Sequence, residues 1–131
     1  MIGLDASALL EFLLGTPVGS RVAGRLAWPG ETLHAPHLLD LEVAQVLRRQ
    51  RRAGVIDEAR GRRVLDNLRA LGIARYAHDI FLPRIWQLRD SVTAYDAAYL
   101  ALAETLAAPL LTLDERLSRS RGHRARVELV A

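Results

Sequence analysis

Short apolar runs alternate with segments of helical pattern along the whole chain, and this alternation constrains the fold most. The apolar runs predict strands over residues 2–4, 32–35, 73–77, 110–112 and 127–130. The segments between them predict helices over residues 6–14, 18–27, 36–52, 57–72, 82–88 and 94–107, and a short helix before the last strand. Such alternation produces a parallel sheet covered on both faces, with right-handed crossovers. The sequence therefore predicts one α/β domain over residues 1–131, an α/β/α sandwich with a mostly parallel sheet of about five strands.

Composition narrows the chemistry available to this domain. The chain has no cysteine, which excludes disulfides, thiolate metal ligands and cysteine nucleophiles. All 18 basic residues are arginine, so lysine-dependent chemistry is excluded as well. The formal charge of +3 and the pI of about 10.1 favour a polyanionic partner. No signal peptide precedes Asp5, and no apolar stretch reaches the ~20 residues of a membrane helix, so we expect a soluble cytoplasmic protein without membrane contact.

Two aspartates follow predicted strands. Asp5 comes directly after the first strand, and Asp114 comes two residues after the fourth. Functional clefts in parallel sheets lie beyond the carboxyl ends of the strands, so both side chains should project into one crevice. Taken alone, each aspartate is more simply interpreted as the cap of the next helix. Their position at the same edge, with two further acids nearby, favours a functional site.

Those two further acids lie on predicted helices beside apolar positions. On a helical wheel, Glu42 falls between Leu38 and Val46, within the apolar stripe of its helix. An unpaired carboxylate is expensive to bury there, so Glu42 needs a cation, a partner or a water-filled cleft. The pattern leaves open both a buried pair with an arginine and a metal ligand. Asp96 lies in the first turn of its helix, at the border of the apolar stripe. It either interacts with the helix dipole or joins the acidic cluster, because Thr93 is the better candidate for the cap.

A hard divalent cation would suit these four carboxylates. Mg²⁺ and Mn²⁺ prefer carboxylate oxygen, keep several waters and activate water for attack on phosphodiesters. Acids that converge on a basic protein therefore predict a metal-dependent site for a phosphodiester. The hydroxyl groups of Ser7 and Thr112 lie two residues from Asp5 and Asp114, and we expect them to orient those carboxylates. Both hydroxyls also suit helix starts, and the sequence leaves that alternative open.

Four blocks of sequence, taken in order, resemble the VapC toxins of type II toxin–antitoxin pairs, which are PIN-domain ribonucleases. The blocks are MIGLDASALL, APHLLDLEVAQVLRR, VTAYDAAYLALAE and PLLTLDERL, and the resemblance covers essentially the whole chain. It implies a PIN-like domain in which a metal-activated water attacks an RNA phosphodiester. It also implies a homodimer that is held inactive by a VapB antitoxin, whose C-terminal tail occupies a groove near the active site. The ligands of Mg²⁺ or Mn²⁺ that it implies are Asp5, Glu42, Asp96 and Asp114.

Arginines gather in two segments, with seven over residues 48–63 and five over residues 116–126. Most are expected to lie on solvated helix faces. The second segment directly follows Asp114 and should flank the cleft, where the guanidinium fork suits phosphate contacts. The residues expected to contact the RNA backbone or the antitoxin are Arg116, Arg119 and Arg121.

Other polar and aromatic residues are assigned no part in the site. Asp40 falls on the opposite side of its helix from Glu42 and is left out. Trp28 and Trp86 are expected to pack in the core or an interface, and the apolar helices over residues 6–14 and 82–88 to supply a dimer or antitoxin surface. No metal-ligand spacing relates the histidines, which are expected to be loop or interface residues: His34, His37, His78 and His123.

Several other classes of protein compete with a toxin nuclease. A phosphoryl-acceptor receiver domain relies on a lysine that this chain lacks, and an aspartate-nucleophile phosphatase needs an aspartate where Ser7 stands. A non-catalytic nucleic-acid-binding module explains the arginines but not Glu42 within an apolar stripe. A PIN-type RNA-processing nuclease without an antitoxin stays open, and the neighbouring genes would distinguish it from a toxin.

Overall fold

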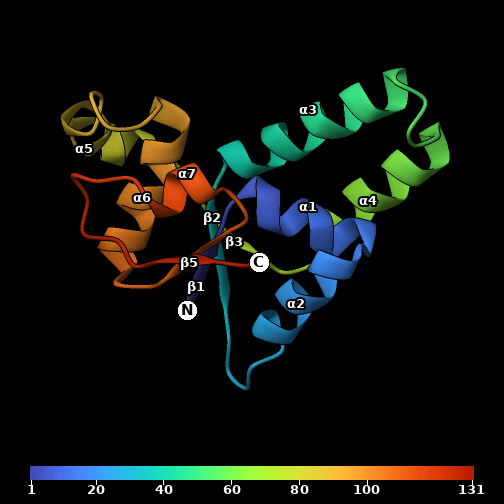
Figure 1. Cartoon of the computed structure of the whole chain (residues 1–131), viewed down its shortest axis with the longest axis horizontal. Helices are drawn as coiled ribbons and strands as arrows, with labels where there is room; N and C mark the ends of the chain where they lie inside the picture. The colour runs from blue at the N-terminus through green and yellow to red at the C-terminus, as the bar shows by residue number, and fades with distance from the viewer.

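The computed structural model describes residues 1–131, and its five strands form one sheet (Figure 1). Every neighbouring pair of strands is parallel, which confirms the predicted α/β class. In their order across the sheet the strands are β3 (Ala74–Tyr76), β2 (Leu33–Pro36), β1 (Ile2–Leu4), β4 (Leu110–Thr112) and β5 (Val127–Leu129).

Helices connect each strand to the next, close to the predicted positions. Side-chain caps begin several of them, with Thr16, Asp57 and Thr93 each accepting a bond from a backbone N–H of the first turn. The unpredicted element is a single 3-10 turn, η1 (Asp79–Phe81). None of the helices has the combination of length and apolar character that a bilayer crossing requires. The α-helices are α1 (Ala6–Leu14), α2 (Pro17–Leu26), α3 (Leu38–Arg52), α4 (Glu58–Ala70), α5 (Leu82–Gln87), α6 (Ala94–Leu106) and α7 (Glu115–Ser118).

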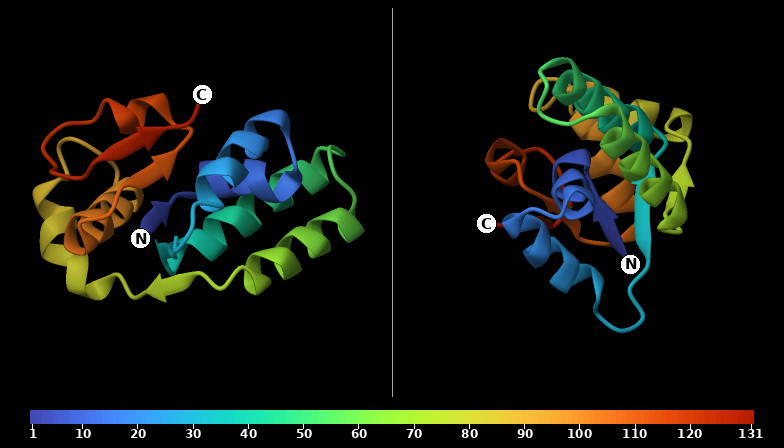
Figure 2. Two further views of the ribbon diagram at one scale, coloured as in Figure 1. Left: turned by 90° about the horizontal axis from the view of Figure 1, so that it is seen from below. Right: turned by 90° about the vertical axis from the view of Figure 1, so that its right-hand side faces the viewer.

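The direction in which the chain crosses the sheet reverses after β3. The chain moves one way across the sheet from β1 to β3, then passes back over it to β4 and β5. Right-handed crossovers therefore put α1 to α4 on one face and α5 to α7 on the other. Figures 1 and 2 show these two groups of helices on opposite sides of the strands. The reversal makes the carboxyl ends of β1 and β4 the topological switch point, where ligands bind in open parallel sheets.

Strands β1 and β4 are buried along their whole length, as expected for strands that are covered on both faces. Helix α6 packs so closely on the sheet that residues 97–103 are all buried. On the other face, α1 and α2 approach each other at Gly19, where a Cβ atom would overlap the Glu11 backbone carbonyl of α1. The core is therefore a sheet held between one long buried helix and a tightly packed helix pair.

Two details of the sequence prediction were wrong, and a third is narrowed. Pro36 does not begin a helix but ends β2, because β2 continues its pairing with β3 as far as Tyr76. His34 is not a loop residue: it is buried in β2, and its ring bonds to Thr32 and to the Tyr76 hydroxyl. For Trp28 and Trp86 the core is excluded, because both are exposed with an arginine stacked on each ring, while the interface stays a prediction.

Candidate active site

Asp5 lies at the switch point, directly after β1, and begins α1. One of its carboxylate oxygens, Oδ1, accepts bonds from the Ala8 backbone N–H at 3.1 Å and the Ser7 hydroxyl at 2.6 Å. The other oxygen, Oδ2, accepts a bond from the Thr112 hydroxyl. The capping interpretation is therefore correct for Asp5, but it engages only part of the carboxylate. The side chain is buried, and this burial raises the pKa of Asp5 in spite of its three hydrogen bonds.

Ser7 and Thr112 connect the two strand ends that form the crevice. The Thr112 hydroxyl accepts a bond from the Asp114 backbone N–H at 3.0 Å while it donates to Asp5. The Ser7 hydroxyl accepts a bond from the Leu113 backbone N–H at 3.0 Å while it also donates to Asp5. Each hydroxyl therefore holds the Asp5 carboxylate against the loop after β4. This geometry is the one expected of side chains that orient the carboxylate.

Glu42 lies in the second turn of α3 and reaches the crevice from the α1–α4 face. Its Oε1 accepts a bond of 2.6 Å from the hydroxyl of Tyr99, a buried residue of α6 on the opposite face. No arginine forms an ion pair with Glu42, so the arginine alternative left open by the sequence does not occur. Burial raises the pKa of Glu42, and the charges of Asp96 and Asp5 raise it further.

Tyr99, whose hydroxyl bonds to Glu42, was not among the site residues predicted from the sequence. Burial and its bond to Glu42 raise the pKa of the phenol, which therefore stays a proton donor. The available signal was a tyrosine within a buried helical stripe, because a buried hydroxyl needs a partner. The partner lies 57 residues away in sequence, and no local pattern identifies it.

Asp96 enters the crevice from the first turn of α6, where Thr93 caps the helix as expected. Its half-buried carboxylate forms no ion pair and lines a cavity of about 500 Å³ together with Arg89 and Arg116. Burial raises the pKa of Asp96, and the charges of Asp114 and Asp5 add to the increase. Arg116 opposes the increase, so this arginine faces the acidic cluster.

Asp114 caps α7 with one oxygen. Its Oδ1 accepts bonds from the backbone N–H groups of Arg116 at 2.8 Å and Leu117 at 3.4 Å. The Arg116 guanidinium lies 3.7 Å from the same oxygen, but its side chain is 93% exposed, so this ion pair is weak and the arginine is free to turn toward a ligand. Asp114 Oδ2 has no hydrogen-bond partner within the chain and remains available.

The chemical character of this cluster fits a hard divalent cation. Four carboxylates arrive from four different segments, and three of them have raised pKa values because of burial and mutual repulsion. No three of the groups converge closely enough in the structure to hold an ion directly. Mg²⁺ needs only one or two direct carboxylates and keeps several waters, so these residues could hold it partly through water.

The remaining predicted residues lie outside this crevice. Asp40 forms a bidentate pair with Arg75, at 2.7 and 3.0 Å, which ties α3 to β3 and agrees with its omission from the site. Arg119 pairs with Glu115 on α7, and Arg121 is exposed in the following loop. Neither lines the cavity beside Asp96, so only Arg116 of the three predicted contacts is near the acids.

Known proteins with the same architecture define the class of this chain. A family model described as the PIN domain matches residues 2–122. The crystal structure of PAE2754 from Pyrobaculum aerophilum superposes with a TM-score of 0.70 at 23% identity, over 95% of this chain and 87% of that one. The crystal structure of Mycobacterium tuberculosis VapC20, titled a sarcin-ricin loop cleaving toxin, superposes with a TM-score of 0.69 at 12% identity, over 90% and 93% of the two chains. These two likenesses concern the fold alone.

Two relatives found by sequence are more nearly identical to this chain than these two structures are. Ribonuclease VapC12 of Mycobacterium tuberculosis is 46% identical over 131 residues, which is the full length of both proteins. VapC ribonuclease Mb0985 of Mycobacterium bovis is 42% identical over 118 residues, 90% of this chain and 89% of its own length. The chain therefore belongs to the PIN-domain family, within the VapC ribonucleases.

Proposed function

We propose that this chain is a divalent-metal-dependent endoribonuclease, the toxin of a type II toxin–antitoxin pair, with its active site at Asp5, Glu42, Asp96 and Asp114. The observation that carries the proposal is that four carboxylates lie near enough to one another at the switch point for their charges to raise the pKa values of three of them. Repulsion between them has no structural use, and the three with raised pKa values form no ion pair with an arginine. An RNA substrate is supported by membership in the VapC ribonucleases, and RNA cleavage implies a cytoplasmic location.

Each residue of the site has a defined task in this proposal. When bound, Mg²⁺ or Mn²⁺ supplies an activated water and neutralises charge on the phosphodiester. The carboxylates would hold that ion, while Ser7 and Thr112 fix the orientation of Asp5. Tyr99 holds Glu42 in the same way, by donating its phenolic proton to Oε1. Arg116 is exposed beside the acids and would bind a phosphate oxygen of the substrate.

RNA cleavage by the purified protein tests this function. Wild type should cleave RNA with Mg²⁺ or Mn²⁺ and should stop when EDTA is added. Asp5→Asn and Asp96→Asn should each lose cleavage, whereas Asp66→Asn, an exposed aspartate of α4, should match wild type. Cleavage that continues in EDTA, or full activity in both site variants, would show that the acidic cluster is not the metal site.

We also propose a VapB-type antitoxin as the physiological partner. It would cover the crevice that contains the four acids and exclude RNA from it. Expression of the chain alone should slow growth, and co-expression of a small protein encoded beside it should restore growth. The same protein should inhibit RNA cleavage in vitro and co-purify with the chain. Normal growth without any partner would instead favour an RNA-processing nuclease that needs no antitoxin.

A homodimer is the proposed assembly, with a second copy covering an apolar groove between α3, α5 and α6. This groove has a volume of about 300 Å³, and it is lined by Leu41, Leu82 and Tyr95 among others. Leu41 is 72% exposed and Leu82 55%, and large apolar side chains gathered in this way mark an interface. Light scattering should find a dimer for wild type and a monomer for Leu82→Arg. Val55→Arg, at an exposed residue after α3, is the matched control and should stay dimeric.

A further inference from the structure

Two segments carry the positive charge of this chain, and they flank the acidic site. Residues 48–69 hold eight arginines against three acidic residues, a net charge of +5, and residues 115–131 hold five against two, a net charge of +3. The chain as a whole is +3, so the remainder, which contains all four site acids, is −5. A polyanion is therefore drawn to the site by these two segments and not by its immediate surroundings.

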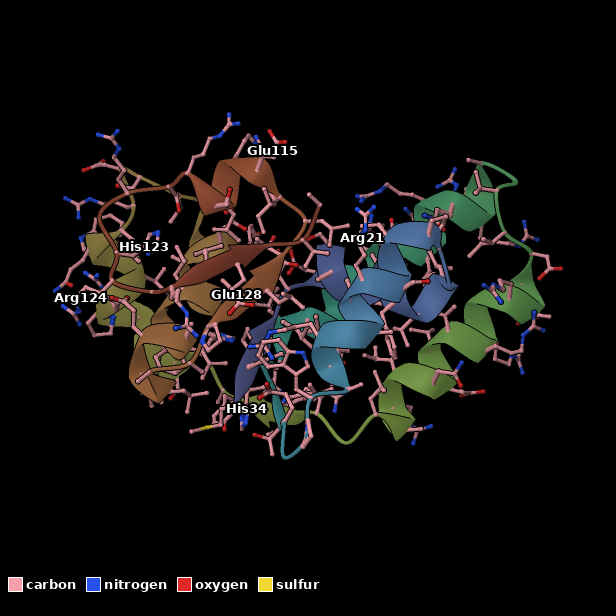
Figure 3. The ribbon with its side chains drawn as sticks, turned by 60° about the horizontal axis from the view of Figure 1, so that its bottom comes forward. Arg21, His34, Glu115, His123, Arg124 and Glu128 are labelled. Carbon is pink, nitrogen blue, oxygen red and sulfur yellow. The ribbon has the colours of Figure 1, made fainter.

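The first basic segment lies at one end of the molecule, and the loop of the second segment around His123 and Arg124 lies at the other (Figures 1 and 3). Figure 1 shows α3 and α4 as a hairpin that extends away from the sheet on one side. Figure 3 shows His123 and Arg124 at the other end. The crevice with the four acids lies between them, since α3 begins at the sheet edge and α7 follows Asp114. A strand that crosses the crevice can thus contact one basic segment on each side.

A groove runs from the acidic site along α3 toward the hairpin. It has a volume of about 480 Å³, and its lining includes Ser7, Glu42, Gln45, Arg49 and Tyr95. Glu42 and Arg49 are seven residues apart, so they lie on one face of α3 separated by roughly 10 Å along the helix axis. The groove therefore joins a proposed metal ligand at one end to an arginine at the other.

Arg49 has the properties of a phosphate ligand. Its side chain is exposed, and it forms no ion pair with any carboxylate of the chain. Arg52 lies one turn further along the same face and is exposed and unpaired as well.

We propose that this groove along α3 holds the RNA strand on one side of the cleaved phosphodiester, with Arg49 and Arg52 bound to backbone phosphates. The inference rests on the ribonuclease function proposed above and adds the path of the substrate. Unpaired guanidinium groups along a groove that leads to the acids match the phosphate backbone of a single nucleic-acid strand. The cavity beside Asp96, with Arg89 and Arg116, receives the strand on the other side of the site.

The same helix supplies a matched control. Arg48 and Arg51 are also exposed and form no ion pair, but they line a different groove, between α3 and α4, together with Asp57 and Glu58. The double variants Arg49→Ala/Arg52→Ala and Arg48→Ala/Arg51→Ala remove the same charge from neighbouring positions of one helix. Only the first pair lies on the face that leads to Glu42.

Binding of a fluorescently labelled single-stranded RNA of mixed sequence, measured in EDTA over a range of NaCl concentrations, tests the path without cleavage. The Arg49→Ala/Arg52→Ala variant should bind on the order of tenfold more weakly than wild type. The slope of log K against log [NaCl] should become shallower by about 0.7 for each phosphate that no longer binds an arginine, or about 1.4 for the pair. With Mg²⁺ present, KM should rise while kcat stays near wild type, because these arginines bind the phosphates equally in the ground and transition states.

The outcomes separate this inference from the function on which it rests. The Arg48→Ala/Arg51→Ala variant should stay close to wild type in affinity and in salt slope. If wild type cleaves RNA and both double variants weaken binding equally, the arginines act only through net charge and the proposed path is wrong. An unchanged affinity in Arg49→Ala/Arg52→Ala, with loss only of binding to a protein partner, also overturns it. If wild type neither binds nor cleaves RNA, the proposed function fails and the path fails with it.

Discussion

The Thr112 hydroxyl links the two sides of the candidate site, and its removal tests how strongly that link holds the acids. Thr112 is fully buried, and its side chain donates to Asp5 Oδ2 while it accepts from the Asp114 backbone N–H at 3.0 Å. Thr112→Val replaces the hydroxyl by a methyl group of similar size. The substitution therefore removes two hydrogen bonds while it leaves the packing of β4 nearly unchanged.

The expected magnitude follows from these two bonds. A hydrogen bond to a charged group contributes about 1.5–3 kcal/mol, and a buried N–H without a partner costs about 1–3 kcal/mol. The two effects share one hydroxyl and do not add fully, so we expect Thr112→Val to lower the free energy of unfolding by about 2–4 kcal/mol. For a domain of this size, that corresponds to a decrease in Tm on the order of 10 °C. Cleavage should fall by roughly 10–100-fold, the usual effect of losing a residue that orients a metal ligand.

Thermal and chemical denaturation, together with the RNA cleavage assay, measure both effects. Thr105→Val is the control, because the Thr105 hydroxyl bonds only to the Ala101 carbonyl within α6, at 2.8 Å. We expect that control to stay within about 0.5 kcal/mol of wild type and to cleave normally. In an Asp5→Asn background the stability cost of Thr112→Val should shrink by about 1 kcal/mol or more, because the bond to the carboxylate is then no longer charge-assisted. If Thr112→Val matches wild type in stability and activity, the hydroxyl does not hold the site together.

Three further predictions test other parts of the structure. Gly19→Ala should lower the free energy of unfolding in denaturant by about 2 kcal/mol or more, because the new Cβ would overlap the backbone of α1. Gly24→Ala, in the open part of α2, should raise that free energy by about 0.5–1 kcal/mol, and equal effects of the two substitutions would contradict the close helix contact. Burial alone would raise the pKa of Glu104, but its hydrogen bonds, chiefly from Arg84, lower that pKa overall. Glu104→Gln should therefore destabilise the protein near neutral pH and approach wild type as the pH falls through the lowered pKa, and a pH-independent difference in stability would refute this. Asp114→Asn should keep the cap of α7 and stay near wild type in stability, while Asp114→Ala should lower the free energy of unfolding by about 1 kcal/mol. Both variants should lose RNA cleavage, and an alanine variant that still cleaves RNA would show that Asp114 is not part of the site.

The fold could be predicted because its signals are local. The apolar runs, the proline and glycine breaks and the capping residues each act within a few positions, and the alternation of strands and helices then admits few topologies. The boundary at Pro36 was missed for a non-local reason, since the last residue of β2 is fixed by its pairing with Tyr76 of β3. A strand that gains a ladder partner continues past the point at which local preference would begin a helix.

In the candidate site, too, the features with a local signal could be predicted and those that depend on distant contacts could not. The positions of Asp5 and Asp114 follow from the rule for the carboxyl ends of parallel strands, because Asp5 directly follows the first predicted strand and Asp114 lies two residues beyond the fourth. The partner of Glu42 could not be predicted, because the bond from Tyr99 joins helices on opposite faces of the sheet. A helical wheel shows that a carboxylate is in an apolar stripe, but it does not show what lies across the interface.

For an aspartate at the end of a strand, capping a helix and serving a functional site are not alternatives in this fold. Asp5 and Asp114 both cap the helix that follows, and each cap engages Oδ1 alone. The backbone N–H bonds fix the carboxylate plane, so the second oxygen is aimed by the same contacts that begin the helix. At Asp5 that oxygen receives Thr112, and at Asp114 it has no partner within the chain. A cap at the switch point therefore directs the second carboxylate oxygen toward the crevice, and at Asp5 the Thr112 hydroxyl holds it there. The sequence evidence for a cap and the sequence evidence for a metal ligand therefore concern the two oxygens of one carboxylate.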